Sequence, residues 1–454
     1  MATTYLSRTL EAATNRKICT YSGWVKKSSL SGSQMLFGAG DTNARYGFLN
    51  FANHNALFTM SGTDDATDWA LTSSRVFRDP AFWYHVCVTY DSTESVAADR
   101  IKMYINGTQL TSFSAETYPD LNEDFQWTYT GDTQLVGKYP WNADYWNGIM
   151  AHVHYIDGTA YAPTAFAETD STSGIWIPIT SPSITYGNQG FFLKFASGAL
   201  GTDSSGNGNN FTVSGTMTTT KDTPQNNFAT INPVARTPAD TGSLTNGNNT
   251  YSLSNYSYNG RSTLAMTTGK WYWEYKTTTG VNTRVGICTS GYNPNLDTDD
   301  SAAYWGSTGN GGIHVLNTSS GTSWGRTNND TSQNRDTITS ALASGAGSII
   351  SIALDVDAGK MWCAVNGVWF NSGDPAAGTN DIMTLTNSSP DPYQVFLGFN
   401  SSSAYTADVN FGNGYFGTTA VSSSESDDNG EGSFEYDVPA GFYALCTNNL
   451  GSES

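Results

Sequence analysis

The sequence predicts an all-β protein with two tandem jelly-roll β-sandwich domains, and two observations support this fold class. A hairpin pattern with period two occurs once in each half of the chain, at residues 84–110 and 349–370. Only 13% of residues are charged, and Gly, Ser, Thr and Asn fill the spaces between short apolar runs. Such a chain suits short strands joined by polar loops better than it suits long helices.

The first hairpin pattern has two apolar-periodic runs separated by a polar loop. The residues that share one face of these runs are Val86, Val88, Tyr90, Ile101, Met103 and Ile105. The second run leads into Asn106-Gly107, and this dipeptide is the strongest local indication of a tight hairpin turn. We therefore expect an antiparallel hairpin with one face in a core.

The second hairpin pattern follows the same rule. Its shared face consists of Ile350, Ile352, Leu354, Met361, Cys363 and Val365. It ends in Asn366-Gly367, and the segment from Asp355 to Gly359 supplies the turn between its strands. The spacing Asp355-x-Asp357-x-Gly359 resembles the start of a calcium loop, but the twelfth position is Asn366 and not the bidentate Glu that such loops need. We interpret it as a plain turn.

Further short strands are expected on either side of the first hairpin. They fall at residues 18–27, 35–37, 47–51, 56–60, 133–138, 146–157 and 191–195. The motifs FWYHVCVTYD, IKMYINGTQL, LVGKY and YWNGIMAHVHYIDGTAYAPTAF, with DSSGNGNNFT, together resemble the laminin-G-like (LamG), concanavalin A-like lectin fold. The resemblance implies a β-sandwich over residues 1–221.

The second half begins after residues 222–247, which are rich in Pro and Asn, lack alternation and are therefore interpreted as a linker. GKWYWEY, RVGI, IALDVDAGKMWCAVNG and a late NFG follow in an order that resembles SPRY domains. The resemblance implies a second β-sandwich over residues 248–454. Residues 422–433, SSSESDDNGEGS, have the composition of a flexible acidic surface loop.

A LamG-like domain followed by a SPRY-like domain resembles virion structural proteins of tailed bacteriophages. The resemblance implies a tail-fibre, spike or capsid-decoration component at the virion surface, with other virion proteins and host-surface glycan as partners. It also implies a homo-oligomer, with a trimer favoured. The sequence names neither the glycan nor the host.

Charge and targeting signals exclude several classes of partner. The 21 Lys and Arg residues face 40 Asp and Glu residues, giving a net charge of −19, which argues against nucleic-acid binding. The amino terminus lacks the apolar core of a signal peptide, and no apolar run is long enough for membrane insertion. The five cysteines are isolated, as expected for core residues of a protein made in the host cytoplasm.

Catalysis is the main alternative to binding, because glycoside hydrolases also use this fold. They need two carboxylates facing each other across a cleft, and no E-x-D-x-x-E run occurs here. In the nearest equivalent strand, residues 149–157, His152 and His154 occupy the positions at which a glycoside hydrolase needs carboxylates, and they share a strand face. They are interpreted as surface or interface histidines, with a metal pair as the alternative. We expect no enzymatic activity; a polysaccharide depolymerase is the rival function.

Sugar binding needs flat aromatic faces beside amide or carboxylate groups, and two loops have that composition. The candidates in the first loop are Tyr139, Trp141, Asn142, Asp144 and Trp146. Those in the second loop are Asp299, Asp300, Tyr304 and Trp305. The alternative is that these aromatic rings pack under loops or in subunit contacts.

One loop has the composition of a calcium site. Asp203, Asn207 and Asn209 lie in DSSGNGNN, and they supply the hard oxygen ligands that Ca²⁺ prefers. LamG-like domains often bind calcium at one rim. The competing interpretation is an Asx-rich turn whose side chains satisfy its own backbone. No other cofactor is expected.

Overall fold

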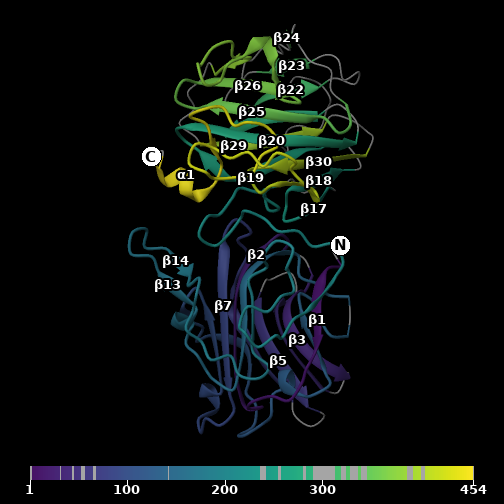
Figure 1. Cartoon of the computed structure of the whole chain (residues 1–454), viewed down its shortest axis with the longest axis vertical. Helices are drawn as coiled ribbons and strands as arrows, with labels where there is room; N and C mark the ends of the chain where they lie inside the picture. Colours follow the sequence, from purple (N-terminus) through teal and green to yellow (C-terminus); the bar gives the residue numbers. More distant parts are fainter. Residues whose placement is uncertain are drawn as a thin grey trace. The chain divides into compact units, whose positions relative to one another are not determined.

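The computed structural model divides into two compact units, residues 1–219 and 220–454 (Figure 1). It describes residues 3–30, 32–42, 45–52, 57–64, 68–141, 143–235, 242–253, 257–279, 283–289, 312–317, 324–327, 336–338, 345–385, 392–399 and 404–452. In the described part of the chain, no helix is long and apolar enough to cross a membrane. In the described residues, both units are built from strands that pair antiparallel, apart from one short parallel pair in the second unit, which confirms the predicted all-β fold class.

The larger sheet of the first unit contains, in its described part, eight strands in the order β10-β6-β5-β4-β3-β11-β1-β16. Their bounds are β1 (Tyr5–Thr9), β3 (Gln34–Thr42), β4 (Arg45–Ala52), β5 (Leu57–Asp64), β6 (Asp68–Val76), β10 (Phe113–Thr117), β11 (Thr133–Val136) and β16 (Thr212–Ser214). The inward side chains of this sheet include Phe37, Leu49, Met60 and Leu71, all fully buried. They form one half of the core of the unit.

The opposing sheet of the first unit has, among the described residues, six strands in the order β15-β12-β2-β7-β8-β9. Their bounds are β2 (Ile18–Lys27), β7 (Trp83–Asp91), β8 (Ile101–Ile105), β9 (Thr108–Gln109), β12 (Gly148–Asp157) and β15 (Phe191–Leu193). Val86 pairs with Ile105 and Val88 with Met103, so the predicted hairpin is confirmed in register. These four residues lie in the core.

The outer face of the six-stranded sheet is covered by residues 158–186, which we call the cover segment. It contains η3 (Pro163–Ala165) and the paired strands β13 (Ala167–Thr169) and β14 (Trp176–Pro178). A second, smaller cluster of buried residues lies beneath it and includes Cys87, Ile156, Phe166 and Phe192. The remaining short helices of this unit are η1 (Ala97–Asp99) and η2 (Gln126–Thr128).

The second unit contains, in its described part, a nine-stranded sheet with the path β17-β18-β30-β20-β25-β26-β27, with β28 paired to β26 and β33 to β20. The bounds are β17 (Ser243–Thr245), β18 (Thr250–Leu253), β20 (Lys270–Thr279), β25 (Ile349–Asp355), β26 (Lys360–Val365), β27 (Val368–Trp369), β28 (Met383–Thr384), β30 (Tyr405–Asn410) and β33 (Tyr443–Ala444). Ile352 pairs with Cys363, and Ile350 with Val365, as the second hairpin pattern predicts.

The facing sheet of the second unit has, among the described residues, six strands in the order β19-β29-β21-β22-β23-β24. The bounds are β19 (Ser257–Met266), β21 (Thr283–Thr289), β22 (Gly312–Asn317), β23 (Trp324–Thr327), β24 (Asp336–Ile338) and β29 (Tyr393–Phe399). Trp271, Trp273, Ile287 and Val395 are among the residues that fill the core between the sheets. The five cysteines of the chain are all buried and free, as predicted.

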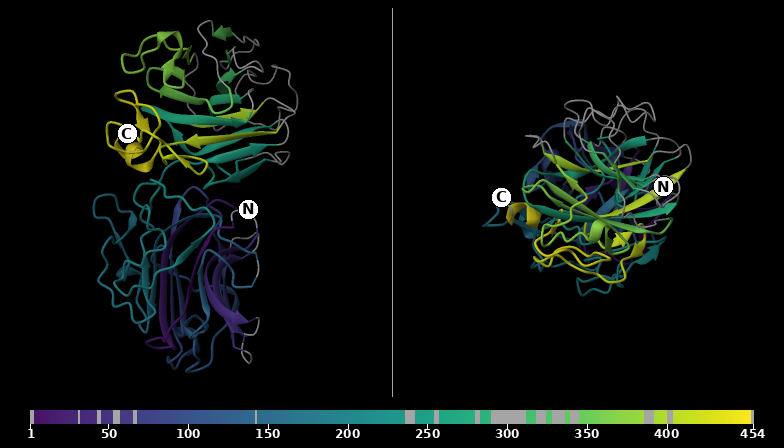
Figure 2. Two further views of the ribbon diagram at one scale, coloured as in Figure 1. Left: turned by 45° about the vertical axis from the view of Figure 1, so that its right-hand side comes forward. Right: turned by 90° about the horizontal axis from the view of Figure 1, so that it is seen from above.

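The predicted flexible acidic loop at 422–433 is instead an ordered part of a segment that we call the C-terminal strap, residues 421–446. Figure 2 shows it, in yellow, beside the nine-stranded sheet, where β33 pairs with β20. Asp427 is buried and accepts hydrogen bonds from the Ala444 N–H (2.9 Å) and from Asn449 Nδ2 (2.8 Å). The acidic residues are therefore fixed by donors from elsewhere in the chain, which the composition did not reveal. The strap is flanked by β31 (Tyr415–Phe416), β32 (Thr419–Ala420) and α1 (Thr447–Ser452).

The segment 222–247 also differs from its interpretation as a linker. Phe228, Ala229 and Ile231 are fully buried in the second unit. Phe228 forms a β-bridge with Cys446, and Ile231 forms one with Ser262. The apolar run FATI therefore docks into this unit, because its backbone and side chains find partners there.

Candidate functional site

Four aromatic residues of the first unit form a surface cluster that we call the aromatic patch: Tyr46, Phe48, Tyr139 and Trp141. Each is half-buried. The rings of Tyr46 and Phe48 are nearly parallel, with centroids 6.0 Å apart and an interplanar angle of 12°. Tyr139 lies edge-on to Phe48 at 5.1 Å, and Trp141 lies edge-on to Tyr46 at 6.3 Å. The patch therefore combines two nearly parallel rings with two rings that stand edge-on to them.

Strand geometry places two of these rings on the outer face of the eight-stranded sheet. Leu49 points into the core, so Tyr46 and Phe48 point outward by the alternation of a β-strand. Their partners on β3 are Gly40 and Gly38, which have no side chains. A Cβ at Gly38 would lie 3.4 Å from Pro140 Cδ and 3.5 Å from Phe48 Cβ. The glycines thus leave room for the aromatic rings and for the loop above them.

The other two rings come from the loop between β11 and β12. This loop is closed by a bridge between Lys138 and Tyr145 and by a hydrogen bond from the Tyr139 N–H to the carbonyl of Asp144 (2.9 Å). The Tyr139 hydroxyl hydrogen-bonds with that of Tyr46; burial, reinforced by this neighbour, raises the pKa of Tyr139 above its ordinary value. Tyr139 therefore presents a neutral phenol at physiological pH.

The structure distributes the sequence-predicted candidates of this loop between two environments. Tyr139 and Trp141 belong to the patch, and the half-buried Asp144 lies in the same loop. Trp146 is 7% exposed and packs in the core against Phe51, with ring centroids 6.3 Å apart. It is therefore a core residue and not a binding residue. Asn142 lies outside the described residues.

Two family profiles match the chain. One, described as the concanavalin A-like lectin/glucanases superfamily, matches residues 2–163, and the other, the SPRY domain, matches residues 270–412. The chain carries a concanavalin A-like lectin domain followed by a SPRY domain. From here on, the first unit is called the lectin domain and the second unit the SPRY domain. No curated protein matches the chain.

Several solved structures are similar to the chain. The native heptameric SAP-like pentraxin from Limulus polyphemus is 14% identical over 36% of this chain and 74% of its own, with a TM-score of 0.28. The SPRY domain of human HERC1 is 14% identical over 39% of this chain and 96% of its own, with a TM-score of 0.27. Domains LG4-5 of the mouse laminin alpha1 chain are 9% identical over 90% of this chain and 84% of their own, with a TM-score of 0.28.

The candidate calcium loop of the lectin domain is satisfied by its own donors. One carboxylate oxygen of Asp203 accepts hydrogen bonds from the N–H groups of Phe192 (2.9 Å) and Ser205 (2.8 Å), and the other accepts from the Asn209 N–H (2.9 Å). Asn207 and Asn209 each donate from Nδ2 to the carbonyl of Gly190, at 2.9 and 2.8 Å. This geometry is that of the Asx-rich turn, the alternative interpretation of the sequence.

A register shift follows Ala151 in β12 and gives His152 a φ of 47°. The two histidine rings still lie side by side, with centroids 6.5 Å apart, and both contact the ring of Phe192. His154 is buried, stacks on Phe192 at 3.9 Å and hydrogen-bonds to the Tyr186 hydroxyl at 3.0 Å. Burial lowers its pKa well below the ordinary value, so it is neutral. The expectation of a surface histidine at this position is therefore wrong. Among the described residues, no group of three or more His, Cys, Asp or Glu side chains could hold a metal ion.

The second candidate loop lies outside the described residues of the SPRY domain; its members are Asp299, Asp300, Tyr304 and Trp305. The plain turn expected at Asp355 is described. The Ala358 N–H donates to Asp355 Oδ1 (2.8 Å), and the Gly269 N–H donates to Asp357 Oδ2 (3.1 Å). Both carboxylates therefore stabilise the ends of strands, as the turn interpretation requires.

A residue of the SPRY domain that the sequence did not single out is Glu274, which is fully buried on β20. Its carboxylate accepts hydrogen bonds from the N–H groups of Glu435 (2.9 Å) and Tyr436 (2.8 Å) and from the Tyr272 hydroxyl (3.1 Å). Burial raises its pKa to about 7. Because both carboxylate oxygens are occupied by donors from the strap and from the sheet, we assign it a structural role: it fixes the strap to the sheet.

Proposed function

We propose that the protein is a non-enzymatic component of a bacteriophage particle that binds host-surface glycan through the aromatic patch of its lectin domain. The observation that carries this proposal is the clustering of Tyr46 and Phe48 with Tyr139 and Trp141 at one surface. Pyranose rings present C–H faces that pack on aromatic rings, while polar groups at the border bind the hydroxyls. Asp144 lies in the same loop and supplies such a group.

The virion role is proposed from the domain combination, which resembles tail-fibre, spike and surface-decoration proteins of tailed phages. We place the protein at the virion surface, after synthesis in the host cytoplasm, in contact with other virion proteins. A shallow patch gives low affinity per site, and many copies on one particle raise the overall affinity by orders of magnitude without any new contact. We further propose a homo-oligomer, with a trimer favoured.

The binding test uses the full chain and a surface polysaccharide extracted from a host strain, with isothermal titration calorimetry as the measurement. We expect Trp141→Ala to weaken binding by about tenfold or more, because one aromatic anchor carries a large share of the binding energy in such sites. Phe82→Ala is the matched control, because Phe82 is a half-exposed aromatic residue of the same domain outside the patch. Unchanged affinity of a folded Trp141→Ala variant would contradict the proposal.

The rival function is a polysaccharide depolymerase on the same fold. It is distinguished by incubating the protein with the same polysaccharide and measuring reducing ends over time, and their steady release would favour the rival. The oligomer is tested separately by size-exclusion chromatography with light scattering. A single monomeric species at micromolar concentration would count against the fibre role.

A further inference from the structure

A groove of about 610 Å³ opens on the SPRY domain, far along the chain from the aromatic patch. It lies between the end of the second hairpin and the C-terminal strap. The residues that line it and matter here are Val368, Trp369, Asp374, Pro375, Asp437 and Val438. Val368 is 55% exposed and lies in this lining beside the carboxylates of Asp374 and Asp437.

Three polar groups of the groove retain unused bonding capacity. The indole N–H of Trp369 and the carboxylate of Asp437 have no hydrogen-bond partner among the described residues. One oxygen of Asp374 accepts from the Ala377 N–H (3.0 Å), which leaves its second oxygen unused within the same part of the chain. Lys360 is close to the groove residues in sequence, but its Nζ lies 3.7 Å from Asp381 Oδ1. It is therefore paired with Asp381, which does not line the groove.

The walls of the groove are fixed before any ligand arrives. Glu274 binds the backbone of Tyr436, directly before Asp437, and a Cβ on Gly367 would lie only 2.8 Å from the Tyr436 ring. On the other wall, Ser372 has a φ of 53°, and its carbonyl accepts a hydrogen bond from Asn380 Nδ2 (3.1 Å). A non-glycine residue in this left-handed region is held there only when its surroundings fix it, as the hydrogen bond from Asn380 does here.

The lining fits an extended peptide. Val368, Val438 and Pro375 offer aliphatic contacts beside the carboxylates of Asp374 and Asp437. β27 is also the last strand on the path of its sheet, so an extended chain can lie alongside it. The two carboxylates favour positively charged side chains on that chain.

We propose that this groove, which brings exposed Val368 and half-buried Val438 beside the carboxylates of Asp374 and Asp437, binds an extended basic segment of a partner protein. The segment presents an apolar side chain to the valines and a Lys or Arg to each carboxylate. An acidic segment is disfavoured as the occupant, because the carboxylates of Asp374 and Asp437 would repel it. The proposal does not depend on glycan binding by the lectin domain.

The test is fluorescence anisotropy with the full chain and short labelled peptides of defined pattern. A peptide that alternates Val and Arg is expected to bind, whereas one that alternates Val and Glu and one that alternates Ser and Arg are not. The double variant Asp374→Asn, Asp437→Asn is expected to weaken binding by about tenfold or more. Val368→Ser is expected to weaken it by about threefold or more, because an apolar contact is lost.

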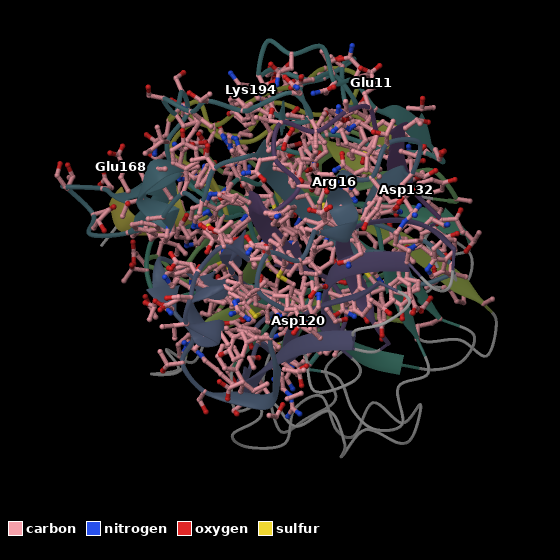
Figure 3. All side chains as sticks on the ribbon, turned by 90° about the horizontal axis from the view of Figure 1, so that it is seen from below. Glu11, Arg16, Asp120, Asp132, Glu168 and Lys194 are labelled. Atoms are coloured by element: carbon pink, nitrogen blue, oxygen red, sulfur yellow. The ribbon has the colours of Figure 1, made fainter. Side chains whose placement is uncertain are left out.

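The matched control removes two exposed carboxylates of the lectin domain, Asp120 and Glu168, which Figure 3 labels. Asp120→Asn, Glu168→Gln changes the net charge equally and should leave binding unchanged. Equal loss in both double variants would show that only overall charge matters and would overturn the proposal. Tight binding of the Val–Glu peptide would also overturn it, as would displacement of the Val–Arg peptide by an oligosaccharide.

Discussion

The Asn-Gly turns of the two domains have almost the same local structure. The φ values are 49° and 76° at Asn106–Gly107, and 50° and 77° at Asn366–Gly367. In the lectin domain the His85 N–H donates to Asn106 Oδ1 at 2.8 Å, and in the SPRY domain the Ile349 N–H donates to Asn366 Oδ1 at 2.9 Å. The same dipeptide therefore builds the same turn in two unrelated sequence contexts.

The segments that cover these turns differ. In the lectin domain a Cβ on Gly107 would lie 3.1 Å from the Trp176 ring, and in the SPRY domain one on Gly367 would lie 2.8 Å from the Tyr436 ring. Trp176 is fixed by a neutral hydrogen bond from Nε1 to His85 Nδ1 (3.1 Å). Tyr436 is fixed through its backbone by a buried carboxylate. The comparison shows that local turn chemistry does not determine how a covering segment is attached.

The largest loss of stability is expected when the carboxylate of Glu274, which attaches the strap to the sheet, is removed. Glu274→Leu keeps a similar volume but leaves the N–H groups of Glu435 and Tyr436 without an acceptor. We expect a loss of about 4 kcal/mol in the free energy of unfolding of the SPRY domain. Hydrogen exchange followed by mass spectrometry should show faster exchange in the strap and unchanged exchange in the lectin domain. Glu425→Gln, at a half-buried strap residue, is the control; an equal effect there would contradict the assigned role of Glu274.

The next largest loss of stability is expected when the glycine of either Asn-Gly turn is replaced by alanine. Alanine at Gly367 meets an unfavourable φ and a close aromatic ring, and we expect a loss of about 3 kcal/mol in unfolding free energy. Gly107→Ala has more room and should cost about 2 kcal/mol. Thermal unfolding of the two variants would measure the difference. A larger effect in the lectin domain would show that the ring at Gly107 is less free to move than the ring at Gly367.

A fall in pH should change the stability of the two domains in opposite directions. Burial lowers the pKa of His85 to about 3, so the unfolded chain takes up a proton below about pH 6.5 that the folded domain excludes. The lectin domain therefore loses stability as the pH falls from 7 to 5. The pKa of Glu274 is raised to about 7, above the unfolded value near 4.5, so its contribution to stability is lost as the pH rises towards and through 7.

Each of these groups changes the unfolding free energy by about 2 kcal/mol between pH 5 and pH 7. Denaturant unfolding of the full chain at the two pH values, with hydrogen exchange assigning each transition to its domain, measures both changes. Glu274→Gln should reduce the response of the SPRY domain and leave that of the lectin domain intact. Parallel responses of both domains in the wild-type chain would be inconsistent with these pKa directions.

The smallest loss of stability is expected when the neutral hydrogen bond between Trp176 and His85 is removed. Trp176→Phe keeps an aromatic ring over Gly107 but removes the hydrogen bond to His85, and we expect a loss of about 1 kcal/mol. Faster hydrogen exchange confined to the cover segment would check this prediction. Tyr436→Phe is the matched change in the SPRY domain, and it should cost less, because the attachment there runs through the backbone. A greater loss from Tyr436→Phe would reverse the comparison.

Part of the candidate site could be predicted from the sequence. Tyr139 and Trp141 were identified from the composition of their loop. The same criterion also selected Trp146, which is buried in the core. Tyr46 and Phe48 were missed, although Gly38 and Gly40 on the neighbouring strand form a matching alternation that could have indicated them. Composition does not report which rings face outward, because that depends on strand register.

The sequence by itself determined the fold class, because period-two apolar patterns and Asn-Gly turns are local and define hairpins wherever they occur. It also determined that the five cysteines are core residues. Only the tertiary structure decided that the acidic residues 422–433 are fixed, that residues 228–231 dock into the SPRY domain, and that Glu274 binds the strap. The last two outcomes depend on partners roughly 160 to 220 residues away along the chain, such as Cys446 for Phe228 and Tyr436 for Glu274. The first depends on donors such as Ala444 and Asn449, 17 and 22 residues from Asp427. Hydrogen bonds and packing between such distant residues leave no periodic trace in a sequence.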